Sequence, residues 1–386
     1  MTEHSTVIEV RDSISSIAPG DWNRLAGDDP FVRHEFLNTL HETGCATART
    51  GWSPRFLILR EAGELAGAMP VYEKTHSYGE YVFDWAWADA YHRHGLDYYP
   101  KLVNAVPFTP VTGQRIFATT TERRRLLITA ALELAQESHA SSLHCLLPPE
   151  NQAQELGQNG LMLRMGVQFH WRNAAYADFG QFLATLNRVK RKKIKQERRR
   201  VADAGVTFAW YTGAEITDDL WVFFNRCYRQ TYRLHHSTPY LNLDFFRALG
   251  ALMPEHMLLV VASSAAGRIA CSLNIFNRDR LCGRYWGALD YVPALHFETC
   301  FYQVIEFCIA RGISVFEGGA QGEHKMARGL LPVTTHSAHW LAHPEFAAAV
   351  EEFLARESRG MAEYIDELGE RSPYKDDADR RSGEFA

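Results

Sequence analysis

The chain carries the same order of elements twice. In its first half, an apolar run at 56–60, a glycine turn and a second run at 65–72 predict a β-hairpin, and the pattern recurs at 257–261 and 269–276. Each hairpin follows two candidate helices and precedes a tryptophan-bearing segment and a long helix. The repeat predicts a duplicated α/β unit, although any two α/β domains share a hairpin and a helix.

The length of 386 residues agrees with two domains. We expect an N-terminal domain at 1–170, a C-terminal domain at 171–370 and a loose charged tail at 371–386. A hydrophobic content of 46% and a charged content of 23% exclude disordered, collagen-like and coiled-coil classes. No apolar run is long enough for a membrane span and no basic apolar leader opens the chain, which predicts a cytoplasmic protein.

Periodicity predicts the elements of the second half in more detail. Helices are expected over 217–233, 243–253, 296–310 and 344–368, a helical turn over 323–328, and strands over 207–211, 256–263, 268–276, 281–289, 313–317 and 333–341. In the first half, the alternation around Trp85 and Trp87 predicts a strand, and a long helix is expected over 121–139.

Charge is concentrated in one segment. The window 188–200 holds nine Lys or Arg and one acid, Glu197, so it carries +8 within a chain of net charge −5. If this window and the apolar residues from 182 to 201 belong to one helix, Lys190, Lys193 and Arg200 lie on the same side of the helix as the apolar residues. This predicts contact with phosphates of a nucleotide, a lipid pyrophosphate or a tRNA, whereas the alternative is a solvated helix paired with Glu197.

Polar residues gather after the short strand that ends at Glu317. Two glycines follow it, so Glu317 is a candidate general base, or else it orders the following loop through backbone N–H groups. His324 and Arg328 are four residues apart and share a helical face, which suits a proton relay and an anion clamp. The other candidates for substrate binding here are Gln321, Glu323 and Lys325. A solvated short helix is the alternative for this turn.

Two further groups of candidates flank the tryptophan segments. His296 and Glu298 open the long second-half helix, where Glu298 is either catalytic or a partner of the helix dipole. In the first half, Asp89, Tyr98 and Lys101 are expected as polar anchors near a cleft between domains. Neither HExxH nor CxxC occurs, and the seven cysteines are expected to be reduced, so no metal site is predicted.

Five motifs resemble the bacterial FemAB-like predicted N-acyltransferases. They are QFHWRN (168–173), KRKKIKQERR (190–199), GRYWG (283–287), LHFETCFYQ (295–303) and FEGGAQGEHKMARGLLP (316–332). The order of elements is similar to the GNAT acyltransferase fold, and its duplication resembles the Fem-type ligases. The resemblance implies an α/β fold of tandem GNAT-like domains with mixed sheets, in which Arg284, Tyr285 and Trp286 bind substrate.

The resemblance also implies an activity. An amine, small or peptidic, would attack an activated acyl donor that is a co-substrate rather than a tightly bound cofactor. The glycine-rich pyrophosphate loop of GNAT enzymes is missing at 293–298 and at 119–122, which favours aminoacyl-tRNA, bound through helix 188–200, over an acyl-CoA or carrier thioester. The competing hypothesis is a non-catalytic anion- or nucleic-acid-binding protein on a degenerate GNAT scaffold. The oligomeric state stays open.

Overall fold

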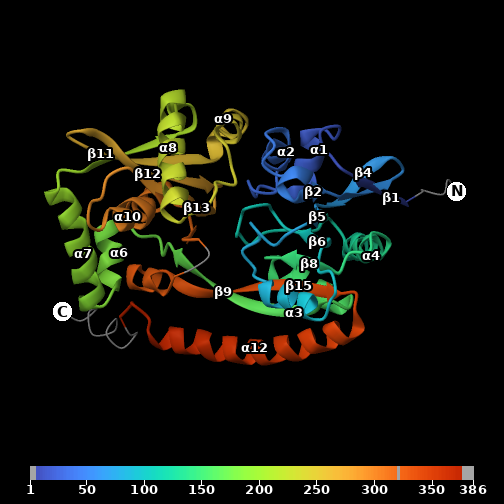
Figure 1. The fold of residues 1–386 in the computed structure, drawn as a ribbon. Helices are drawn as coiled ribbons and strands as arrows, with labels where there is room; N and C mark the ends of the chain where they lie inside the picture. The colour runs from blue at the N-terminus through green and yellow to red at the C-terminus, as the bar shows by residue number, and fades with distance from the viewer. Residues whose placement is uncertain (1–5, 320–321, 376–386) are drawn as a thin grey trace. The chain divides into compact units, whose positions relative to one another are not determined.

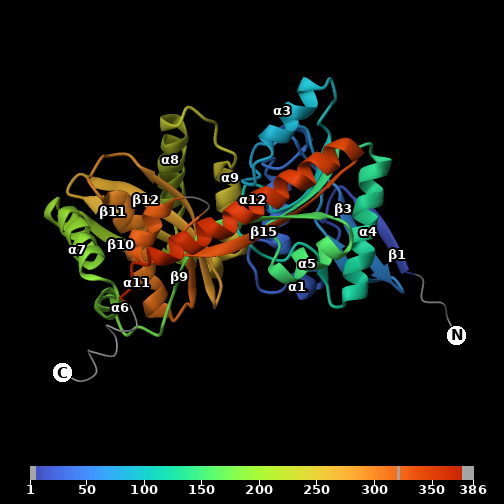
Figure 2. The ribbon, with the colours of Figure 1, turned by 90° about the horizontal axis from the view of Figure 1, so that it is seen from below.

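The structure is a computed structural model that describes residues 6–319 and 322–375. It divides into two compact units (Figures 1 and 2). The first contains the described residues up to Gly166 together with Thr334–Glu363, and the second contains Val167–Val333 and the described residues from Tyr364 onward. The sequence pattern predicts 334–363 as part of the second domain. It belongs to the first unit because Ser337–Leu341 pair with the strand Ser142–Leu146.

The second unit is built on a sheet of mixed direction. Its strands follow the order β10 (Thr207–Thr212), β11 (Met257–Ser264), β12 (Gly267–Phe276), β13 (Arg280–Ala288), β14 (Val315–Glu317) and β9 (Met162–Arg172). Neighbouring strands are antiparallel except β13 and β14, which are parallel. The predicted strand meander is therefore confirmed.

Helices cover both faces of this sheet (Figures 1 and 2). They are α6 (Phe179–Thr185), α7 (Arg188–Asp203), α8 (Asp218–Leu234), α9 (Leu243–Leu252), α10 (Leu295–Phe297), the π-helical turn η4 (Glu298–Tyr302), α11 (Gln303–Arg311) and the 3-10 helix η5 (Glu323–Arg328). Tyr285 of β13 packs against Tyr228 of α8, whereas the next residue, Trp286, packs against His296 of α10. Because side chains alternate along a strand, α8 and α10 lie on opposite faces.

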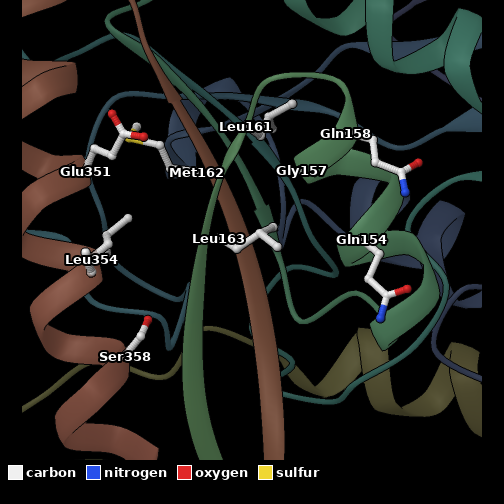
Figure 3. A pocket seen from close by; sticks show the side chains of 10 residues that line it. Gln154, Gly157, Gln158, Leu161, Met162, Leu163, Glu351, Leu354 and Ser358 are labelled. Carbon is white, nitrogen blue, oxygen red and sulfur yellow. The ribbon is translucent and has the colours of Figure 1, made fainter.

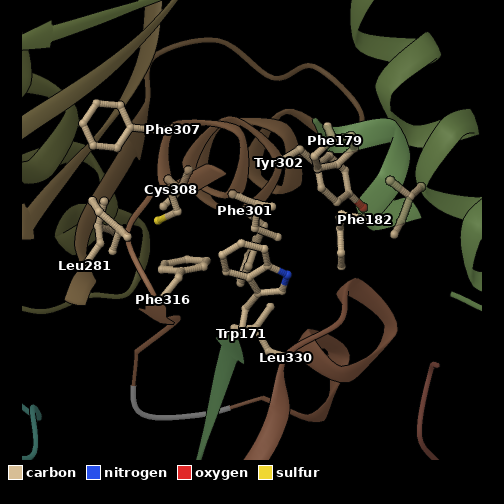
Figure 4. Packing of buried hydrophobic residues seen from close by; sticks show 14 of the residues in the cluster. Trp171, Phe179, Phe182, Leu281, Phe301, Tyr302, Phe307, Cys308, Phe316 and Leu330 are labelled. Atoms are coloured by element: carbon tan, nitrogen blue, oxygen red, sulfur yellow. The ribbon is translucent and has the colours of Figure 1, made fainter. Parts of the chain in front are cut away.

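The core of the second unit lies between the sheet and the α10–α11 helix. Figure 4 shows Phe301, Phe316 and Trp171 gathered there, together with Leu330. The rings of Phe301 and Phe316 are 6.2 Å apart in an edge-to-face arrangement, and those of Trp171 and Phe182 are 5.7 Å apart. Phe316 thus anchors the end of β14, directly before Glu317.

The first unit repeats this order. Its strands are β1 (Thr6–Arg11), β2 (Trp52–Pro54), β3 (Phe56–Glu61), β4 (Glu64–Met69), β5 (Tyr72–Lys74), β6 (Lys101–Asn104), β7 (Phe117–Ala118), β8 (Ser142–Leu146) and the end of β15 (Leu331–Leu341). Its helices are α1 (Pro19–Ala26), α2 (His34–Glu42), α3 (Trp85–Arg93), α4 (Thr121–Glu137), α5 (Glu150–Gln158) and the start of α12 (Pro344–Glu370). The parallel pair β6–β8 corresponds to β13–β14, so the duplicated fold is confirmed.

Two local predictions were wrong. Trp85 and Trp87 lie on helix α3 rather than on a strand, because Trp87 and Tyr91 are buried at helical spacing and alanines fill the positions between. Residues 371–375 are packed rather than loose. Tyr374 donates a hydrogen bond to the carbonyl of Gly329 at 2.7 Å, and the amide of Asn187 bonds to the carbonyl of Pro373 at 2.9 Å. Residues 376–386 lie outside the described residues.

Candidate functional site

Strands β13 and β14 run side by side for three residue pairs and then diverge. Cys282 is the last residue of β13 paired with β14, opposite Glu317, and β13 continues to Ala288 paired with β12 only. A cavity of about 140 Å³ opens at the divergence. Its walls are Ser272, Asn274, Gly283, Arg284, Tyr285, Trp286, His296, Cys300, Phe301, Phe316, Gly318 and Gly319. The carboxyl ends of neighbouring parallel strands are a usual place for ligands in α/β sheets.

A β-bulge shapes the strand side of this cavity. Leu273 of β12 lies opposite Tyr285, but Asn274 lies opposite Gly283, so Arg284 is the extra residue on β13. Bulges redirect side chains and are frequent beside active sites. The predicted residues Arg284, Tyr285 and Trp286 all line the cavity.

A π-helical turn shapes the helix side. Ala294 has a φ of 69° and starts the helix, and residues Glu298–Tyr302 then form η4 before α11 begins. Single π turns inside helices often occur at functional sites. This turn brings Cys300 and Phe301 into the cavity wall. Sequence reasoning missed both, and also Ser272 and Asn274, although the latter two stand out as alternating polar residues in an apolar strand.

His296 is an ionisable side chain that lines the cavity and is held neutral. Its ring lies 5.2 Å from Trp286 and 5.7 Å from Phe301. Burial, followed by nearby His324, Arg328 and Lys325, lowers the pKa of His296 to about 4. Within the described part of the chain, no group hydrogen-bonds to its ring. A neutral imidazole with an available lone pair can accept a proton from a reacting group.

Lys325 provides a cation at the edge of the cavity. Its Nζ donates a hydrogen bond to the carbonyl of Gly319 at 2.7 Å, and Gly319 lines the cavity. Burial lowers the pKa of Lys325 to about 8. No carboxylate of the described residues forms an ion pair with it. Because a buried ammonium without a carboxylate partner is costly, Lys325 is suited to meet an anionic group of a ligand.

Arg328 has a different role from the predicted one. Its Nη2 donates to both carboxylate oxygens of Glu197, at 2.9 and 3.0 Å, and its Nη1 donates to the carbonyl of His324 at 2.6 Å. Its guanidinium also lies 3.3 Å from the ring centre of Phe297. Arg328 therefore ties η5 to α7 and positions the segment that carries Lys325, because its main partner is a protein carboxylate.

The two predicted carboxylates face away from the cavity. Glu298 accepts hydrogen bonds from Arg198 at 3.0–3.2 Å and from Gln303 at 2.8 Å, and its burial raises its pKa. Glu317 lies on the opposite side of β14 from Phe316, and its Oε1 accepts a hydrogen bond from Arg280 at 3.0 Å. Both carboxylates are engaged in ion pairs, and neither lines the cavity.

The remaining candidates near η5 are exposed or undescribed. His324 is exposed and packs 6.0 Å from the ring of Phe297. Glu323 accepts a hydrogen bond from the hydroxyl of Tyr364 at 2.6 Å. Gln321 lies outside the described residues.

The arrangement predicted for the basic segment was wrong. Helix α6 ends at Thr185, and Asn187 caps α7 by accepting a hydrogen bond from the amide of Lys190 at 3.0 Å. This break changes the phase of the helix, so its buried positions are Ile194, Glu197 and Val201. Lys193 and Arg200 are exposed, Lys190 is half-buried, and Val189 is 73% exposed. The cations therefore form a solvent-facing surface.

Tyr98 and Lys101 meet in one buried network, which Asp89 does not join. Asp89 is exposed on α3 and forms an ion pair with Arg93 at 3.0 Å. Lys101 is fully buried in the first unit, where its ammonium contacts Asp84 and lies 2.8 Å from Glu80. The hydroxyl of Tyr98 donates to Asp84 at 2.6 Å. Asp89 is absent from this network because it lies on the solvent side of its helix.

The network extends to two buried histidines. His144 lies 3.0 Å from the hydroxyl of Tyr98 and 2.8 Å from His339. Burial lowers the pKa of His144 from 6.5 to about 3. The unfolded chain then binds a proton that the folded chain excludes, so His144 lowers stability as the pH falls below 6.5 toward about 3.

We expect the His144→Gln variant to lose stability less steeply than wild type as the pH falls from about 6 to about 4. One proton fewer is taken up on unfolding, which corresponds to about 1.4 kcal/mol per pH unit. Urea unfolding at several pH values measures the slope. Equal slopes for the two proteins would show that His144 is already protonated in the folded state.

In the first unit, an arginine occupies the corresponding strand divergence. Arg115 lies between the ends of β6 and β8, because its Nε donates to the carbonyl of Leu146 at 2.7 Å while its own carbonyl accepts from Asn104 at 3.0 Å. Its other guanidinium nitrogens donate to the carbonyls of Val111, Gly113 and Gln114. Arg115 is 2% exposed. The divergence in the first unit is therefore filled by protein, unlike that of the second unit.

A larger cavity of about 610 Å³ lies in the first unit between α5, β9 and α12 (Figure 3). Figure 3 shows Gln154 and Gln158 on one side and Glu351 and Ser358 on the other. Glu351 is the one ionisable group among its lining residues. This larger cavity therefore lacks the pair of proton-accepting and cationic groups that acyl transfer requires.

Comparison with known proteins agrees with the fold. The structure resembles the C-terminal domain of a putative lysylphosphatidylglycerol synthetase from Agrobacterium fabrum (TM-score 0.54, 11% identity, 86% of this chain and 94% of that chain). It also resembles FemX (TM-score 0.53, 10% identity, 90% and 100%) and L-PGS from Bacillus licheniformis (TM-score 0.52, 11% identity, 83% and 91%). At such identities the likeness concerns the fold alone. No curated protein matches the sequence.

The match to a family model defines the class of the protein, which is an acyltransferase. Residues 13–376 match the FemAB-like family, described as peptidoglycan biosynthesis/recognition, and the chain belongs to this family. Among the described residues, no helix is both long and apolar enough to cross a membrane, and no three potential metal ligands gather.

Proposed function

We propose that the second unit transfers a small activated acyl group to an amine in the cavity between β13 and β14. The observation that carries the proposal is the neutral imidazole of His296 in the cavity wall, with the Lys325 ammonium at its edge. Acyl transfer needs a proton acceptor for the attacking amine and a positive group for the developing oxyanion. His296 and Lys325 have these two properties.

The proposed reaction uses these side chains in two steps. The amine nitrogen attacks the acyl carbonyl carbon, and the new C–N bond forms while His296 accepts a proton from the nitrogen. Lys325 stabilises the negative carbonyl oxygen. When the C–O or C–S bond to the leaving group breaks, the protonated His296 returns its proton to the leaving oxygen or sulfur. Glu317 keeps Arg280 paired and takes no proton.

For the donor, we propose aminoacyl-tRNA before an acyl thioester. The segment 293–298 has no glycine, so it lacks the backbone cradle that binds the pyrophosphate of coenzyme A. The exposed cations of α7 are suited to phosphates, since they face solvent; they are Arg188, Lys192, Lys193, Lys195, Arg199 and Arg200. The family description favours a peptidoglycan peptide as the amine acceptor.

The donor class can be tested directly. The protein is supplied with a lysine-containing peptide and either bulk tRNA charged with labelled amino acids or labelled acetyl-CoA. We expect label to enter the peptide as an amide from charged tRNA. Transfer from acetyl-CoA alone would reverse the donor order, and no transfer from either donor would contradict the proposed reaction.

The basic surface of α7 leads to a quantitative expectation. Replacing Lys193 and Arg200 by Gln should weaken tRNA binding and reduce its salt dependence, because each lost phosphate contact lowers the slope of log K against log salt by about 0.7–0.9. Affinity measured by fluorescence anisotropy at several salt concentrations gives this slope.

The matched control removes two exposed charges elsewhere. Arg93 and Arg125 lie on helices of the first unit and form exposed ion pairs, so their double Gln variant removes the same charge. It should change the slope little. Equal effects of the two double variants would mean that the attraction is diffuse and that α7 is not the binding surface.

A further inference from the structure

One hydrogen-bond acceptor in the cavity wall has no partner. Asn274 is 1% exposed, and its Oδ1 accepts no hydrogen bond from any residue that the structure describes. Its Nδ2 has three distant acceptors, the carbonyls of Leu258 at 3.5 Å and Ser272 at 3.4 Å, and the Ser272 hydroxyl at 3.3 Å. Buried polar groups are normally satisfied, so the free oxygen needs an explanation.

The orientation of this amide follows from its neighbours. If the amide were reversed, Oδ1 would face two carbonyl oxygens, which is repulsive. The Ser272 hydroxyl donates to the carbonyl of Thr299 at 3.2 Å, so it is available to accept from the Asn274 nitrogen. The oxygen of Asn274 therefore points to the other side, toward Gly283 of β13.

Gly283 leaves space beside this oxygen on the cavity side. A methyl group on Gly283 would lie 3.6 Å from Oδ1 and 3.3 Å from the ring of Phe316. Both Asn274 and Gly283 line the cavity. A ligand that enters thus meets the acceptor where a side chain at position 283 would otherwise stand.

The cavity limits the size of such a ligand. A cavity of about 150 Å³ holds one benzene molecule, so the 140 Å³ here suits an acyl group of about six heavy atoms. Trp286 and Phe301 supply apolar walls. An acyl group without a donor would leave Oδ1 unsatisfied, whereas an N–H or O–H donor would pair with it.

We propose that Asn274 determines donor specificity by accepting a hydrogen bond from an amino or hydroxyl group on the α-carbon of a small acyl group. The inference rests on the proposed acyl transfer in this cavity. It predicts discrimination against a plain acyl group of the same size, because only that group leaves Oδ1 without a partner.

Three donors of similar size test the proposal. N-acetylcysteamine thioesters of L-alanine, L-lactate and propionate differ only in the α-substituent, and they are offered with a lysine-containing peptide. For wild type we expect kcat/KM for the alanyl or lactyl donor to exceed that for the propionyl donor by about ten- to hundred-fold. Comparing kcat/KM for the alanyl and lactyl donors shows whether the amine or the hydroxyl is preferred.

The variant Asn274→Leu has a similar volume and no acceptor. In this variant, the ratio of kcat/KM for the alanyl or lactyl donor to kcat/KM for the propionyl donor should fall close to one. Transfer of the propionyl group should be kept or improved. An unchanged preference in Asn274→Leu, or equal use of all three donors by wild type, would overturn the role of Asn274.

A binding measurement separates this inference from the reaction. L-alaninamide, L-lactamide and propionamide are compared by saturation-transfer NMR with wild type and Asn274→Leu. A preference that depends on Asn274, without turnover of any thioester or of charged tRNA, would support the site and contradict the transferase reaction. Turnover without any preference would support the reaction and contradict the site.

Discussion

Replacing His296 by Gln is expected to lower kcat for acyl transfer by about 10²- to 10⁴-fold, the usual contribution of a general base. Protonation of the substrate amine lowers wild-type kcat/KM steadily as the pH falls. His296 should add a further loss as the pH falls through about 4, because burial lowers the pKa of His296 to about 4 and the base acts when deprotonated. Steady-state rates from about pH 3 to about pH 8 measure both effects.

His324→Gln is the control for this prediction. His324 is exposed and packs on Phe297, close to His296 but outside the cavity wall. It should keep most of the wild-type rate. If His324→Gln lost as much activity as His296→Gln, the base would be His324. If His296→Gln kept full activity, the proposed proton transfer would be wrong.

Replacing Lys101 by Met should destabilise the first unit by about 3–5 kcal/mol, the range for breaking a buried ion pair. Lys101 is fully buried, and its removal leaves Glu80 and Asp84 beside each other without their main cation. Lys74 lies opposite Lys101 in the sheet, but its nearest Glu80 oxygen is 3.9 Å away, so it replaces the lost cation only in part. Chemical unfolding monitored by fluorescence gives the difference.

The control for Lys101 is Arg93→Met. Arg93 pairs with Asp89 on the surface of α3, so its loss should change stability by less than about 0.5 kcal/mol. If Lys101→Met does not fold, Lys101→Met combined with Asp84→Leu should recover part of the stability, because one buried charge is removed with its partner. No recovery, or a cost for Lys101→Met as small as for Arg93→Met, would contradict the ion-pair explanation.

Local patterns were sufficient for most elements because they repeat within a single helix or strand. The hairpins at 56–69 and 257–276 follow from apolar runs separated by glycine turns, and the long helix after 295 follows from its apolar spacing. The prediction of a strand at α3 was wrong because Trp, Ala and Tyr alternate at a spacing that fits a strand. In the structure, Trp87 and Tyr91 are buried four residues apart, which is the spacing of a helix.

The site was only partly predictable from the same information. His296, Trp286 and Tyr285 line the cavity as expected, since they flank a strand end in a recognisable motif. The partners of charged residues were not predictable, because Glu197 and Arg328 are 131 positions apart in the chain and meet only when η5 packs on α7. The sequence likewise does not show that Arg280 lies beside Glu317 and Arg198 beside Glu298, so it predicts both carboxylates as catalytic.

The sequence alone thus determined the duplicated α/β fold, the family and the segments that surround the site, because these depend on periodicity and motifs along the chain. Only the tertiary structure decided which polar groups face the cavity. The bulge at Arg284 and the break before α7 each shift side chains by a fraction of a turn. Such shifts decide whether a charge meets a protein partner, the solvent or a substrate, and they arise from packing between distant segments.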